Sequence, residues 1–303
     1  MATFNIEDAA FTGVGLLTKR PAAAIVWALV WAVFIAVVTI PFAGGLTAYV
    51  TLIVRSQFHP ATGDLMPLAT QLGAFALLLG LGGLVVGAVV SCAVYRAMLE
   101  PENSEFAYLR LGDQEIQVMV VNFVRGIILF AINFSLSLVF AVLLLLATSA
   151  GPAIAATVRP IGEAIVLGVL FWVQLRFSLA GPMTYSERRF RLFESWTITR
   201  GLTWRLVAVG LILVVIGAVV YLGVVALGAA GSLAMWTSAP RPADLQVLLS
   251  ESPNQWIGPL APFIALIGLM VLVAGALLTP ISVAPWPYIY RTLKADQGAP
   301  APA

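Results

Sequence analysis

The residues of this sequence best suited to chemistry are arginines that gather between two long apolar runs. Residues 188–205 carry a dense group of them, next to aromatic side chains at helical spacing. A guanidinium group is planar and permanently charged, so it suits the oxygens of phosphate groups. Each Lys or Arg at the cytoplasmic membrane surface gains about 1 kcal/mol of attraction to anionic lipid. The sequence therefore predicts a lipid head-group patch, formed by Arg188, Arg189, Arg191, Arg200, Arg205, Arg96, Arg176 and Arg291.

The aromatic side chains beside this patch predict how it meets the membrane. Phe190, Phe193 and Trp196 recur at the spacing of one helical face, and Gly201 closes the segment as glycine commonly closes helices. We expect residues 179–205 to form an amphipathic helix in the membrane surface, anchored by these aromatics in the acyl boundary. In the alternative interpretation the arginines only fix the topology of the chain and bind no ligand.

Polar residues inside the apolar runs form a second candidate group, namely Asn133, Glu163 and Gln174. A carboxylate in hydrocarbon is costly, so an intramembrane Glu is a candidate for function, for example in a proton relay. Glu163 also follows Arg159 closely and can pair with it at the membrane boundary. Asn133 can equally form an ordinary hydrogen bond between helices. A water-accessible cavity lined by the three residues would favour a transporter.

Sequence signals for catalysis or metal binding are absent. The single cysteine, Cys92, excludes an intramolecular disulfide, and the single histidine, His59, excludes a site that needs two imidazoles. There is no HExxH zinc motif, no glycine-rich phosphate loop and no Gly-x-Ser-x-Gly nucleophile motif. The basic residues lie at the ends of apolar runs, which gives no support for nucleic-acid binding. We therefore predict a protein that is not an enzyme and has no cofactor.

The elements that must position these residues are membrane spans. The chain has 303 residues, of which 61% are hydrophobic and 10% charged, against about 25% charged in a soluble domain. About 20 apolar residues suffice to cross a bilayer as a helix. We predict a single transmembrane domain, residues 1–295, and a disordered tail, residues 296–303. Its six spans are expected at about 22–54, 66–95, 116–147, 160–179, 204–235 and 256–290, with a polar loop at 237–253.

Prolines and glycines predict local features of these spans. Pro41 interrupts the first span, and Pro285 lies in the last turns of the sixth, which we expect to be kinked or unwound. Gly83 and Gly87 form a GxxxG pattern in the second span. Small residues at this spacing allow two helices to approach closely, although glycine is also simply frequent in membrane helices.

The order of surface helix, span, loop and span recurs along the chain. The predicted surface helices lie within residues 4–18, 96–115 and 179–205, and their respective breakers are Pro21, Gly112 and Gly201. Each even-numbered span ends in an aromatic or aliphatic residue followed by arginine, at Tyr95-Arg96, Leu175-Arg176 and Tyr290-Arg291. This recurrence predicts a threefold repeat of helical hairpins, each with a surface helix.

The distribution of basic residues predicts the orientation. Of the 16 Lys and Arg residues, Arg55, Arg159 and Arg241 fall on one side of the predicted spans and all the others on the opposite side. The positive-inside rule then places both termini and the surface helices in the cytoplasm. The N-terminal residues show no basic region ahead of an apolar core, so we expect no cleaved signal peptide.

One stretch also resembles a known pattern, in which a proline and a glutamate follow a span and Ser-Trp, Thr-Arg-Gly and an aromatic precede the next. The matching residues are Pro182, Glu187, Ser195, Trp196, Thr199, Arg200, Gly201 and Trp204. The stretch Pro285–Arg291 adds a Tyr-x-Tyr-Arg ending. The chain thereby resembles the bacterial membrane proteins grouped with the glycerophosphodiester phosphodiesterase membrane domain. The soluble catalytic domain that gives those proteins their name is absent, so the resemblance implies no catalytic residue.

These observations predict an all-α membrane protein of six transmembrane helices with three cytoplasmic amphipathic helices. We expect a multi-pass protein of the bacterial inner membrane that engages lipids, most of all anionic ones. It would assemble with itself or with a membrane-protein partner to organise or shape the membrane. The alternatives are a transporter or flippase for a lipid or other amphiphile, and an accessory subunit of a membrane enzyme.

Overall fold

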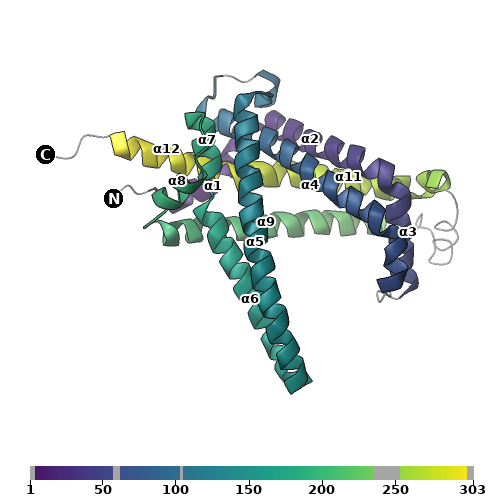
Figure 1. Ribbon diagram of the computed structural model, residues 1–303. Coiled ribbons are helices and arrows are strands. Elements are labelled where there is room, and N and C mark those ends of the chain that lie inside the picture. The colour runs from purple at the N-terminus through teal and green to yellow at the C-terminus, as the bar shows by residue number, and fades with distance from the viewer. Residues whose placement is uncertain (1–3, 57–61, 103–104, 235–252, 299–303) are drawn as a thin grey trace. The chain divides into compact units, whose positions relative to one another are not determined.

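The computed structural model describes residues 4–56, 62–102, 105–234 and 253–298. Over these residues the chain is helical and contains no strand (Figure 1). Six helical segments are long and apolar enough to cross a membrane: Pro21–Leu46, Leu65–Leu99, Phe106–Ala150, Pro152–Glu187, Thr203–Ala234 and Ala265–Ala295. The prediction of an all-helical membrane protein with six spans is therefore confirmed. The predicted loop at 237–253 lies almost wholly outside the described residues, as does the end of the tail, 299–303.

Prolines and glycines set most of the helix boundaries. Pro41 lies in a short 3-10 turn that interrupts the first span, as predicted, and Pro285 begins the last helix after a break at Ala284. The helices are α1 (Ile6–Lys19), α2 (Pro21–Thr39), η1 (Ile40–Phe42), α3 (Ala43–Arg55), α4 (Thr62–Leu99), η2 (Glu105–Tyr108), α5 (Asp113–Ala150), α6 (Pro152–Arg176), α7 (Ala180–Glu187), α8 (Leu192–Ile198), α9 (Thr203–Ala234), α11 (Pro253–Val283) and α12 (Pro285–Gly298).

The chain divides into two compact units, which we describe separately. The first comprises Met1–Gly13, Ala88–Val214 and Val283–Ala303, and the second comprises Val14–Gly87 and Val215–Ser282. In the second unit the GxxxG face of α4 packs against aromatic rings of α2. The Trp31 ring lies 3.7 Å from the position a Cβ on Gly87 would take, and the Phe34 ring lies 3.9 Å from that of Gly83. The glycine face of α4 therefore makes room for the aromatic side chains of α2.

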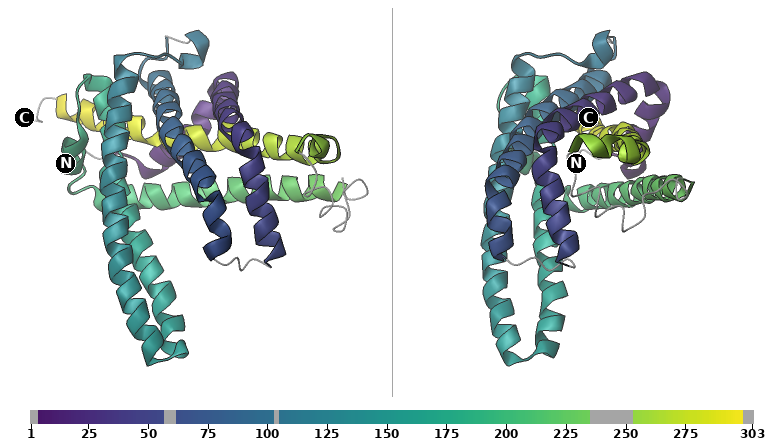
Figure 2. Two further views of the ribbon diagram at one scale, coloured as in Figure 1. Left: turned by 45° about the vertical axis from the view of Figure 1, so that its right-hand side comes forward. Right: turned by 90° about the vertical axis from the view of Figure 1, so that its right-hand side faces the viewer.

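The first unit contains an antiparallel hairpin of α5 and α6, which lie side by side in both figures (Figures 1 and 2). Gly151 joins them with φ 137°, a conformation that glycine adopts without strain. Gly162 faces the ring of Phe140, so the two helices approach closely there. Large apolar side chains along both helices are exposed, for example Phe134 and Leu167. Such surfaces suit contact with lipid chains.

The segment predicted as one surface helix, residues 179–205, is different in the structure. It forms two short helices, α7 and α8, separated at Arg188, whose φ of 52° is left-handed. The residues of α7 from Ala180 to Tyr185 are all buried, so this half of the segment belongs to the protein core. The prediction of a continuous helix was wrong because neither glycine nor proline marks the break.

The predicted surface helix at 96–115 is also absent from the described residues. Helix α4 continues to Leu99, and α5 begins at Asp113. Between them the described residues form only η2, where Phe106 and Ala107 have left-handed backbone angles. Helix α1, in contrast, covers most of the predicted N-terminal segment 4–18.

Candidate functional site

Helix α7 organises the first unit, in which most of the candidate residues lie. It packs against α5, α8 and α12. Its N-cap Leu179 and its own Met183 join a cluster of buried residues that includes Leu206 of α9 and Ile289 of α12. A short helix can be this buried because its residues are small or apolar, as in the run Ala-Gly-Pro-Met. A Cβ at Gly181 would meet the Tyr95 hydroxyl, so a larger residue there would force the buried Tyr95 ring to shift.

Arg96, at the end of α4, is buried with only 3% of its surface exposed. Its guanidinium group donates to the Glu115 carboxylate at 2.6 Å and to the Tyr108 carbonyl, and it lies 5.6 Å from the centre of the Tyr185 ring. Glu115 is 4% exposed. This arginine therefore connects α4, α5 and α7, and its charge is neutralised inside the protein.

Arg176, at the end of α6, is also buried. Its guanidinium carbon lies 4.8 Å from the centre of the Trp196 ring, and NH1 donates to the Thr203 hydroxyl at 3.4 Å. Its backbone carbonyl accepts hydrogen bonds from the Ser195 hydroxyl at 2.9 Å and the Thr199 hydroxyl at 3.4 Å. Helix α8 and the residue after it, Thr199, therefore contact the end of α6 through polar side chains.

These two arginines share one arrangement. Each lies at the end of an even-numbered span and bonds the first turn of the next span, since Glu115 is in the first turn of α5 and Thr203 begins α9. Arg291, the corresponding arginine of the sixth predicted span, is exposed. The residue before each arginine is buried: Tyr95, Leu175 and Tyr290.

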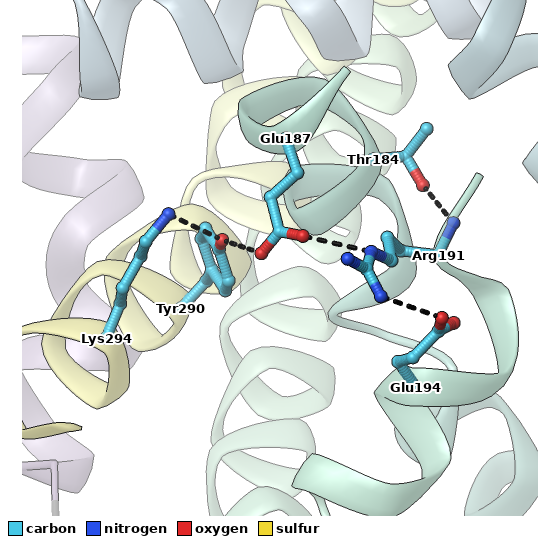
Figure 3. A network of polar contacts seen from close by, with 6 residues as sticks. All are labelled: Thr184, Glu187, Arg191, Glu194, Tyr290 and Lys294. Atoms are coloured by element: carbon cyan, nitrogen blue, oxygen red, sulfur yellow. Dashed lines mark hydrogen bonds and ion pairs between the residues drawn. The ribbon is translucent and has the colours of Figure 1, made fainter. Parts of the chain in front are cut away.

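A polar network connects α7 and α8 with α12 (Figure 3). Glu187 accepts a hydrogen bond from the Tyr290 hydroxyl at 2.9 Å and pairs with Arg191 at 2.9 Å. Arg191 also pairs with Glu194 at 3.0 Å, and Lys294 donates to the Tyr290 hydroxyl at 3.4 Å. The hydrogen bond with Glu194 and the charge of Glu187 raise the pKa of Arg191. A hydrogen bond from its own backbone N–H, together with Arg191, lowers the pKa of Glu194.

The structure therefore divides the predicted head-group patch. Arg96 and Arg176 are buried and Arg191 is ion-paired, so all three serve contacts within the protein. The remaining five carry no hydrogen bond or ion pair from their side chains to any residue that the structure describes. Four of them are exposed, namely Arg188, Arg189, Arg200 and Arg291. The fifth, Arg205, is half-buried.

The aromatic anchors also divide. Phe190 and Phe193 are 44% and 62% exposed, and Trp204 at the start of α9 is 85% exposed. Trp196 instead turns to the protein, with its ring centre 5.3 Å from those of Trp172 and Phe177. Exposed aromatics and unpaired arginines therefore occur together between Arg188 and Arg205, beside two candidate spans.

A polar pocket of about 570 Å³ opens between the ends of α4, α5 and α7. Both signs of charge line it, from Arg96, Arg110 and Arg188 and from Glu100, Asp113 and Glu115. Gln117 also lines it, and its buried side-chain oxygen has no hydrogen-bond partner in the described chain. Sequence reasoning did not find this pocket, because Arg96 and Arg188 are brought to the stretch 110–117 from other parts of the chain.

The polar residues of the predicted spans are not brought together. Glu163 pairs with Arg159 at 3.1 Å, and both side chains are largely exposed. Gln174 is exposed and Asn133 is half-buried. None of the three lines the polar pocket. The pairing of Glu163 with Arg159 agrees with the interpretation of a membrane-boundary ion pair.

Sequence reasoning named Ser195 and Thr199 only as part of a resemblance and did not single out Glu115, so the inward-facing hydrogen bonds of all three were missed. Ser195 and Thr199 are four residues apart, a spacing that places both on one helical face and gave a usable signal. For metals, the described residues contain no group of three or more His, Cys, Asp or Glu side chains that could hold an ion.

No protein-family model, curated protein or solved structure matches this chain.

Proposed function

We propose that this chain is a non-catalytic integral membrane protein that holds anionic lipid head groups with residues 188–205. The observation that carries the proposal is the coincidence of unpaired, exposed arginines with exposed aromatic rings in that segment. Guanidinium groups attract phosphates, and aromatic rings favour the boundary between head groups and acyl chains. Because the segment joins two candidate spans, both interactions are available at the same membrane surface.

The proposal includes a bacterial inner-membrane location, cytoplasmic termini and a threefold repeat. The asymmetry of Lys and Arg supports the orientation. The matching positions of Arg96 and Arg176 support the repeat, since each bonds the first turn of the following span. Assembly with another copy or a membrane-protein partner would let such a protein organise its surrounding lipids.

Transport of a lipid remains an alternative prediction, although the described structure gives it no additional support. That alternative depended on a cavity lined by Asn133, Glu163 and Gln174. In the structure Gln174 is exposed and Glu163 pairs with Arg159, so neither points to such a cavity. The alternative role as an accessory subunit of a membrane enzyme likewise gains no support from any contact among the described residues.

Neutralising three of the exposed arginines is expected to reduce the retention of anionic lipid. At about 1 kcal/mol each, the variant R188Q/R189Q/R200Q should lose up to roughly a hundredfold in affinity for phosphatidylglycerol at low salt. Added salt should weaken retention by the wild type, because screening acts over about 8–10 Å. Native mass spectrometry of protein extracted from defined lipid measures the bound molecules. The matched control is R55Q/R159Q/R241Q, which removes equal charge from the predicted periplasmic side, and equal losses in both variants would contradict the proposal.

Cysteine labelling is expected to report the orientation. In a Cys92→Ala background, cysteines introduced at Thr62 or Ser250 should react with a membrane-impermeant thiol reagent from the periplasm. Cysteines at Thr18 or Ala299 should react only after the membrane is opened. Labelling at Ala299 in intact cells would place the C-terminus outside and overturn the proposed orientation.

A further inference from the structure

We propose that the polar pocket between α4, α5 and α7 binds the zwitterionic head group of a phospholipid with a phosphate and a primary ammonium, of the phosphatidylethanolamine type. This inference rests on the proposed lipid-binding function and adds a second class of head group, held by a pocket that shares only Arg188 with residues 188–205. The pocket has three arginines and three carboxylates, and Arg96 is already neutralised by Glu115 at 2.6 Å. The other charged side chains of the lining also have both signs, which matches a zwitterion better than a simple anion.

One part of the pocket suits a phosphate. Arg188 lines it and carries no ion pair to any described residue. Gly112, the N-cap of α5, also lines the pocket and supplies no side-chain hydrogen bond to the first turn. The N–H groups at such a helix start lack partners within the helix and favour negative charge. An arginine and a helix start therefore offer donors to the same phosphate oxygens.

The carboxylates of the pocket lining suit an ammonium group. Asp113 and Glu100 supply carboxylates. Asp113 is exposed and carries no hydrogen bond or ion pair to any described residue, so its carboxylate is open to N–H donors of a ligand. A primary ammonium has three N–H donors, whereas the trimethylammonium of choline has none. The pocket should therefore discriminate between these two common head groups.

The surroundings of the pocket suit a lipid rather than a soluble phosphate ester. Leu111 lines the pocket although it is 83% exposed. Along α5 the exposed residues Ile116, Val120, Phe123 and Ile127 follow at spacings of four, three and four. They form an apolar stripe on one helical face, which begins beside the pocket and continues into the candidate span. An acyl chain can follow this stripe while its head group occupies the pocket.

The test uses the full chain in nanodiscs with equal amounts of phosphatidylethanolamine, phosphatidylcholine and phosphatidylglycerol, followed by native mass spectrometry. One hydrogen bond to a charged group is expected to give about a tenfold preference for phosphatidylethanolamine over phosphatidylcholine. Asp113→Asn, which removes the exposed carboxylate charge at nearly constant size, should abolish most of this preference. Arg188→Gln should weaken retention of phosphatidylethanolamine, whereas its neighbour Arg189, outside the pocket lining, is the matched control as Arg189→Gln.

Equal retention of the two zwitterionic lipids by the wild type would overturn the inference. So would an equal loss of phosphatidylethanolamine in R188Q and R189Q, since general charge would then explain the binding. Displacement of the lipid by micromolar glycerophosphoethanolamine, which lacks acyl chains, would assign the pocket to a soluble ester and also overturn it. The proposed function fails separately, through unchanged phosphatidylglycerol retention in R188Q/R189Q/R200Q.

Discussion

Replacing Glu115 with glutamine, with Arg96 left in place, is expected to lower the free energy of unfolding by about 3–5 kcal/mol. Both side chains are buried, at 4% and 5% exposure, and their charged atoms are 2.6 Å apart. The substitution would leave the arginine charge inside the protein without its counter-ion. The cost of an unpaired buried charge exceeds the value of the ion pair itself, which explains why the effect is large.

The loss should spread to the turn before α5. Phe106, Ala107 and Tyr108 have φ angles of 47°, 55° and 67°. Left-handed conformations cost about 1–2 kcal/mol for each residue with a side chain. Burial of Tyr108 and the hydrogen bond from Arg96 to its carbonyl hold this turn. Faster hydrogen exchange in residues 105–112 of Glu115→Gln would report its loosening.

Two further variants separate the ion pair from its surroundings. Glu194→Gln removes the partner of Arg191 in an ion pair whose carboxylate is 45% exposed, and its cost should stay below about 1 kcal/mol. The double variant R96M/E115L removes both buried charges, and it should recover much of the stability lost by Glu115→Gln. Unfolding in a titration with denaturing detergent measures all three. A Glu115→Gln variant within 1 kcal/mol of the wild type would contradict the buried pair.

The sequence predicted the spans well because their signal is local. Each span is a continuous apolar run, and Pro41 and Pro285 interrupt the helices where their rings remove backbone hydrogen bonds. The burial and the bonding partners of Arg96 and Arg176 could not be predicted in the same way. The pairing of Arg96 with Glu115, 19 residues further on, depends on how α4 and α5 pack. An arginine at the end of a span looks the same in sequence whether it meets lipid or a carboxylate.

The break at Arg188 was hidden for a related reason. Arginine is uncommon in the left-handed region, and tertiary contacts hold it there. Among these contacts, the Arg191 N–H bonds the Thr184 hydroxyl at 3.2 Å and Glu187 bonds Tyr290 of α12. These partners come from different helices, so a helical pattern in the sequence continues through a position where the helix stops. The periodicity of Phe190, Phe193 and Trp196 therefore predicted one face, although the break separates Phe190 from the helix that carries the other two.

Replacing Trp196 with alanine is expected to destabilise the protein by about 2–4 kcal/mol. The substitution removes two aromatic contacts, worth roughly 0.5–1.5 kcal/mol each, and a cation–π contact of up to about 2 kcal/mol. Those contacts are with Trp172 and Phe177, at 5.3 Å between ring centres, and with the Arg176 guanidinium at 4.8 Å. Arg176 would remain buried with fewer partners, which makes this loss larger than that of an ordinary half-buried side chain.

Phe193 provides the matched control, since it lies on the same short helix three residues earlier. It is 62% exposed, so Phe193→Ala should change the free energy of unfolding by less than about 0.5 kcal/mol. The two variants should also differ in lipid retention. Phe193→Ala should lower it, because an exposed ring contributes to membrane contact, whereas Trp196→Ala should not, because that ring packs on α6. Detergent-titration unfolding and native mass spectrometry of retained lipid measure the two effects. If Phe193→Ala destabilised the protein as much as Trp196→Ala, both rings would be part of the packed core, and the separation of α8 into a protein-facing and a lipid-facing side would be wrong.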